Sequence, residues 1–69
     1  MKGAIKMEFT IKQARNYSSR TQAEMAKELG VSLPTYREYE HGNIQMKVET
    51  AKLFAKVVNV PFENIIFCN

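Results

Sequence analysis

The chain offers few side chains whose chemistry could drive a reaction. His41 is its one histidine and Cys68 its one cysteine, so the sequence has too few soft ligands for a structural metal. It has no nucleophile–base set, no paired catalytic acid and base, and no glycine-rich phosphate loop. We therefore predict that the protein is not an enzyme and that it carries neither a metal nor a cofactor.

The charges are mildly basic overall but unevenly distributed. Ten lysines and arginines stand against seven acidic residues, all of them glutamates, which gives a net charge of +3. Residues 1–20 hold most of the positive excess, whereas residues 21–46 carry more glutamates than basic residues. This balance permits a polyanionic partner but does not require one.

The clearest start signal for a helix lies at Thr21. Thr21 and Glu24 have the spacing of a capping box, in which each residue hydrogen-bonds the backbone of the other. Gly30 can end such a helix at positive φ. The pattern predicts a helix over about residues 22–29.

A second helix is predicted directly after the first, over about residues 33–41. Ser32 is a suitable N-cap, and Pro34 falls in the first turn, where its missing N–H is not needed. A three-residue connection that contains Gly30 is typical of a helix-turn-helix. The second helix of such a pair projects from the surface and can enter a DNA major groove.

The rest of the sequence favours an all-α fold. Apolar positions at helical spacing predict helices over about residues 10–17 and 47–58, and a last short helical turn over 62–67. Alternation typical of strands does not persist. Residues 1–8 are expected to form a flexible basic arm and residues 9–69 a single domain. The predicted architecture is a compact bundle of five short helices.

The sequence TQAEMAKELGVS at residues 21–32, followed by TYREYEHG at residues 35–42, resembles the phage repressor/Cro-type (XRE-like) helix-turn-helix family. The similarity covers roughly residues 9–66, and it is specific because spacing and residue type agree at many positions. The resemblance implies a lambda-repressor-like fold. It also implies sequence-specific binding of double-stranded DNA by a transcriptional regulator, of the phage or bacterial repressor type.

The resemblance also implies roles for individual residues. Base contacts are expected from the outward side of the second helix of the motif: Leu33, Pro34, Thr35, Arg37 and Glu38. Contacts with the phosphate backbone are expected from Gln22, Ser32, Arg15, Arg20, Asn43, Gln45 and Lys47. Arg15 and Glu40 match a partly buried ion pair that, in this family, ties the first helix to the third.

The side chains expected at the bases suggest which groups they would recognise. Arg37 could donate to guanine, Glu38 could accept from cytosine N4, and Leu33 could contact a thymine methyl. Tyr36 and Tyr39 lie three positions apart and are predicted to pack in the core. Exposed stacking platforms, the alternative for these tyrosines, suit single strands better than duplexes.

The apolar C-terminal residues Phe62, Ile65, Ile66 and Phe67 have two interpretations. They either close the core or form a two-fold interface. We favour a homodimer that assembles on DNA, because a two-fold dimer reads half-sites about one helical turn, ~34 Å, apart.

A different function on the same fold is a protein-interaction module of the antitoxin or antirepressor type. The negative charge of residues 21–46 and the apolar tail would suit that function. No apolar run reaches the roughly 18 residues needed to cross a bilayer, and the N-terminus lacks a signal-peptide pattern. We therefore expect a cytoplasmic protein without a membrane partner.

Overall fold

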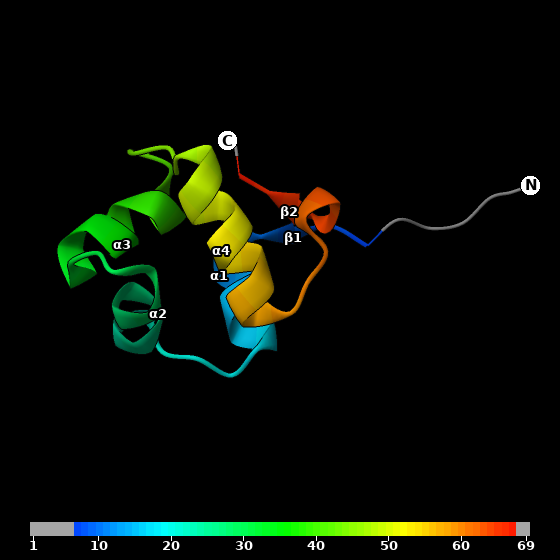
Figure 1. Cartoon of the computed structure of the whole chain (residues 1–69), viewed down its shortest axis with the longest axis horizontal. Coiled ribbons are helices and arrows are strands. Elements are labelled where there is room, and N and C mark those ends of the chain that lie inside the picture. The colour runs from blue at the N-terminus through cyan, green and yellow to red at the C-terminus, as the bar shows by residue number, and fades with distance from the viewer. Residues whose placement is uncertain (1–6, 68–69) are drawn as a thin grey trace, which may run out of the picture.

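The computed structural model describes residues 7–67, and within them four α-helices precede a short 3-10 turn (Figure 1). The helices are α1 (Ile11–Tyr17), α2 (Gln22–Leu29), α3 (Leu33–His41) and α4 (Val48–Val58), followed by the 3-10 turn η1 (Phe62–Asn64). Two short strands, β1 (Phe9–Thr10) and β2 (Ile65–Ile66), complete the fold. Most of the predicted N-terminal arm, and Cys68, lie outside the described residues.

Helices α2 and α3 form the predicted helix-turn-helix. The Thr21 hydroxyl accepts a hydrogen bond from the Glu24 N–H (3.0 Å), and the Glu24 carboxylate accepts one from the Thr21 N–H (2.9 Å). Gly30 ends α2 in the left-handed conformation, with φ of 71°. The Ser32 hydroxyl then accepts from the Thr35 N–H (3.2 Å) and begins α3. The short connection leaves α3 packed against α2 at one end of the molecule (Figure 1).

The core lies where the four helices meet, and each helix contributes one side chain that is 0% exposed. These are Ala14, Met25, Tyr36 and Phe54, in chain order. Tyr39 is also buried, and its ring meets that of Tyr36 edge to face with centroids 6.3 Å apart. The prediction that both tyrosines pack in the core is confirmed.

The fold differs from the prediction at its two ends. The fifth helix predicted over residues 62–67 is wrong, because η1 is a single 3-10 turn and β2 follows it. Strand β2 pairs in parallel with β1, with Phe9 opposite Ile65 and Thr10 opposite Ile66. The β-branched pair Ile65–Ile66 favours extended backbone. Strands of two residues are too short to show the alternation of apolar and polar residues, so the sequence could not predict this strand pairing.

None of the helices in residues 7–67 combines the length and the apolar character that crossing a membrane requires.

The turn at Gly30 gives the first testable prediction. A Cβ added there would have nothing within 4 Å, so the cost of Gly30→Ala arises from the positive φ alone. We expect the substitution to lower the free energy of unfolding by about 1 kcal/mol. Alanine is strained in the left-handed conformation, and this cost exceeds the stabilisation that alanine gives by restricting the unfolded chain. Urea denaturation measures the change. Gly30→Asn should cost less, since asparagine tolerates this conformation, and an alanine variant as stable as the parent would contradict the prediction.

Candidate nucleic-acid interface

Helix α3 keeps one side inside the domain and leaves the other exposed. Tyr36 and Tyr39 point into the core. The opposite side is made of residues that are exposed or partly exposed: Leu33, Pro34, Thr35, Arg37, Glu38 and His41. The five residues expected to contact bases all belong to this set, which we call the outer face of α3.

Glu40, near the end of α3, is the centre of a hydrogen-bond network that joins three helices. Arg15 of α1 donates from Nε to Glu40 Oε2 (2.5 Å) and from Nη2 to Oε1 (3.4 Å). The Tyr36 hydroxyl donates to Oε2 (2.7 Å), and Gln22 of α2 donates from Nε2 to Oε1 (2.9 Å). The side chain of Glu40 is only 2% exposed, so these bonds replace the water that a carboxylate would otherwise keep.

The network also sets the protonation states of its members. Burial opposes the charge of Glu40, but the hydrogen bonds from Arg15, Tyr36 and Gln22 outweigh burial and hold its pKa below the ordinary value of 4.5. Burial, together with the bond to Glu40, raises the pKa of Tyr36. The bond to Glu40 likewise raises the pKa of Arg15. At neutral pH the network is therefore a carboxylate, a guanidinium and a protonated phenol, and the ion pair adds no net charge to the surface.

Arg15 has the ion-pair partner that the family resemblance implied. Its side chain is 10% exposed, and its third nitrogen, Nη1, donates to the backbone carbonyl of Arg20 (2.9 Å). Arg15 thereby fixes the α1–α2 connection as well as Glu40. A guanidinium buried and engaged in this way is unsuited to the phosphate contact that we expected of Arg15.

Gln22 connects this network to the outer face of α3. While Nε2 of Gln22 donates to Glu40, its Oε1 accepts from Nε of Arg37 (3.3 Å). Reasoning from the sequence placed Gln22 at the DNA backbone and missed both bonds. No local sequence pattern predicts these two hydrogen bonds, because residues 22, 37 and 40 come together only through the turn at Gly30.

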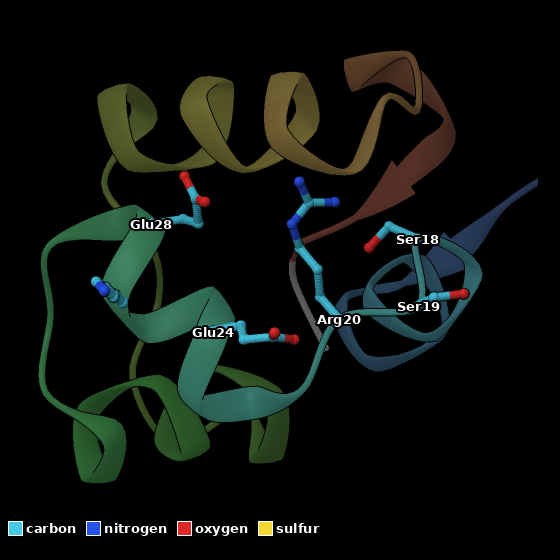
Figure 2. Close-up of a pocket in the computed structure, with 6 residues that line it drawn as sticks. Ser18, Ser19, Arg20, Glu24 and Glu28 are labelled. Atoms are coloured by element: carbon cyan, nitrogen blue, oxygen red, sulfur yellow. The ribbon is translucent and has the colours of Figure 1, made fainter.

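The acidic excess of residues 21–46 lies away from the outer face of α3. Glu40 is neutralised by Arg15. Glu24 and Glu28 project from the side of α2 opposite Gln22, as the helical period requires. They line an open hollow of about 640 Å³ together with Ser18, Ser19, Arg20 and Lys27. Figure 2 shows Glu24, Glu28 and Arg20 among the side chains of this hollow. Arg20, expected at the DNA backbone, thus shares a surface with two carboxylates.

The segment after α3 extends its exposed surface. Gly42 ends α3 at φ of 79°. Asn43, Gln45 and Lys47 follow and are exposed, whereas Met46 between them is buried and anchors the segment. Asn43 also donates from Nδ2 to the Glu38 carboxylate (3.3 Å), which links this segment to the outer face of α3.

The C-terminal residues divide between core and surface. Ile65 is 7% exposed and belongs to the core, so it is not available for the dimer interface that we predicted; its pairing opposite Phe9 turns the side chain inward. Phe67 packs against the core, with its ring 6.0 Å from that of Phe54. Phe62 and Ile66 are 42% and 40% exposed and remain accessible to a partner.

Comparison with known families agrees with this geometry. A family model described as helix-turn-helix matches residues 11–65, which is most of the chain. The chain belongs to this XRE/Cro-type helix-turn-helix family, whose domains bind DNA and are not catalytic. No curated protein and no solved structure matches the chain.

The depressed pKa of Glu40 predicts how stability depends on pH. Because its pKa is lower in the folded than in the unfolded state, the stability that it contributes is present above about pH 4.5 and is lost as the pH falls through the folded pKa. Glu40→Gln should therefore lower the free energy of unfolding by about 1.5–3 kcal/mol at pH 7. The difference from the parent should shrink as the pH falls below 4.5.

Urea denaturation at a series of pH values measures this difference. Glu28→Gln removes one exposed carboxylate outside the network and is the matched control. A constant gap between parent and Glu40→Gln from pH 7 to pH 3 would show that the charge of Glu40 is not what stabilises the fold.

Proposed function

We propose that this domain is a transcriptional regulator of the repressor type, which binds double-stranded DNA at specific sequences with α3 in the major groove. One observation carries the proposal. The outer face of α3 is exposed or partly exposed along its length, while its inner side is held by the core tyrosines and by Glu40. The major groove of B-DNA, about 12 Å wide, accepts a single helix presented in this way.

Base recognition is assigned to the outer face of α3. Arg37 would donate to guanine O6 and N7, and Glu38 would accept from cytosine N4. Leu33 and Pro34 offer apolar contact to a thymine methyl, and Thr35 a hydroxyl. The proposal is supported by the exposure of Arg37 and by the bond from Asn43, which orients the Glu38 carboxylate.

Backbone contacts are assigned to groups that flank this face. The N–H groups of the first turn of α2, at Gln22, point out of the helix end and suit a phosphate. Ser32 stands at the corresponding end of α3. Asn43, Gln45 and Lys47 would follow the phosphates beyond α3. Because few cations take part, we expect a moderate dependence of affinity on salt.

We further propose that two copies pair when they bind DNA, so that two α3 helices read half-sites about one helical turn, ~34 Å, apart. Support comes from Phe62 and Ile66, two exposed apolar side chains on neighbouring elements, η1 and β2. Two-fold pairing would bury them against their counterparts.

The decisive experiment is selection of duplexes from a random DNA pool, followed by affinity measurement on the enriched sequence. The proposal expects a defined motif and much weaker binding to unrelated DNA. Recovery of no motif, together with no binding to random duplex at low salt, would contradict it. A protein-interaction role on the same fold would then be the better account.

Two substitutions separate the two kinds of contact. Arg37→Ala should cost about 1–3 kcal/mol on the preferred duplex and relax discrimination at one base pair. Lys47→Ala should weaken binding to every duplex alike and lower the slope of log K against log salt by about 1. Fluorescence anisotropy at several salt concentrations measures both effects.

Lys56→Ala is the matched control for this pair, since Lys56 lies at the opposite end of α4 from Lys47 and should not alter affinity. The assignment of roles would be wrong if Arg37→Ala and Lys47→Ala had the same effect on preferred and unrelated duplexes.

A further inference from the structure

We infer that Gln22 is a positioning residue for sequence recognition: it holds Arg37 so that the outer edge of the guanidinium faces a base. The inference rests on the proposed function, and it gives the Gln22 side chain a task other than the phosphate contact that the family resemblance implied.

The Gln22 amide lies between two groups of fixed and opposite hydrogen-bonding character. On one side its Nε2 donates to Glu40 Oε1 (2.9 Å), and on the other its Oε1 accepts from Arg37 Nε (3.3 Å). A carboxylate only accepts and a guanidinium only donates. One orientation of the amide therefore satisfies both neighbours, and the flipped orientation would satisfy neither.

Glu40 cannot move to relax this arrangement. Arg15 from α1 donates to both of its oxygens, and Tyr36 from α3 donates to Oε2 as well. The side chain of Glu40 is also almost fully buried. Because Glu40 is fixed in the interior, it holds the Gln22 amide in place. Gln22 in turn restrains Arg37, an exposed residue on the outer face of α3.

The bond that Gln22 makes leaves the recognition edge of Arg37 open. It engages Nε, while the two Nη nitrogens are the groups that can pair with guanine O6 and N7. An unrestrained arginine loses side-chain freedom when it binds, which costs roughly two- to tenfold in affinity. Holding Arg37 before DNA arrives removes part of that cost, and it does so only where Arg37 finds its base.

A phosphate contact and a positioning role have different signatures. Nε2 of Gln22 has a second N–H that could still donate to a phosphate. Such a bond would strengthen binding to every duplex equally and would cancel in the ratio of two affinities. Positioning of Arg37 strengthens binding to the preferred duplex alone, so it appears in that ratio.

The experiment measures the affinity ratio between the selected duplex and one altered at the base pair assigned to Arg37. The proteins are the parent, Gln22→Met, Arg37→Met and the double variant. We expect Gln22→Met to lower the ratio roughly two- to tenfold. Arg37→Met should lower it further, and adding Gln22→Met to Arg37→Met should change it no more. Gln13→Met, the same chemical change in the α1 capping box, should leave the ratio unaltered.

Failure of this inference is distinguishable from failure of the proposed function. If the parent discriminates between the duplexes but Gln22→Met has the same ratio as the parent, the positioning role is overturned and the DNA-binding role stands. Additive effects of the two substitutions would also overturn it. If the parent does not discriminate at any base pair, the proposed function itself fails.

A measurement on the unmodified domain keeps the inference testable even if Gln22→Met does not fold. The NMR order parameter of the Arg37 Nε–H bond in the free protein should approach the value of about 0.85 that is typical of rigid backbone. A value below about 0.6 would show an unrestrained side chain and would overturn the inference without any DNA present.

Discussion

The domain depends on a single buried carboxylate. Glu40 sits where α1, α2 and α3 meet, and each of these helices supplies it with a hydrogen-bond donor: Arg15, Gln22 and Tyr36. A charge buried without such donors would cost several kcal/mol, so the three helices must keep the positions that let the donors reach it. The orientation of α3, and with it the exposure of its outer face, follows from that requirement.

The pairing of this carboxylate also bears on how residues 21–46, which carry more glutamates than basic residues, can lie near a polyanion. Pairing with Arg15 removes the charge of Glu40 from the surface, and the period of α2 places Glu24 and Glu28 on the side away from Gln22. The outer face of α3 then carries Arg37 and Glu38, one charge of each sign. If this face reads DNA as proposed, recognition depends more on which groups it presents and how firmly they are held than on net charge.

Local signals in the sequence predicted the helix-turn-helix well, because its caps depend on residues close together in the chain. Thr21, Gly30 and Ser32 each act as the sequence indicated. Such local signals could not predict contacts between residues that lie far apart in the chain. Ile65, predicted to lie in a last short helix and at a dimer interface, instead pairs with Phe9 in a strand. Its side chain belongs to the core. The bonds of Gln22 to Glu40 and Arg37 arise only once the turn at Gly30 has closed. The family resemblance supplied the Arg15–Glu40 pair, which spacing alone could not.

Titration of the isotope-labelled domain with its selected duplex, followed by amide chemical shifts in NMR spectra, tests the central claim most directly. The account predicts that the largest shift changes fall on the outer face of α3, around Arg37, and on the segment from Asn43 to Lys47. Residues at the far end of α4, such as Lys56, should change little. Changes concentrated on Phe62 and Ile66, with α3 unaffected, would contradict the claim that α3 is the surface that meets DNA.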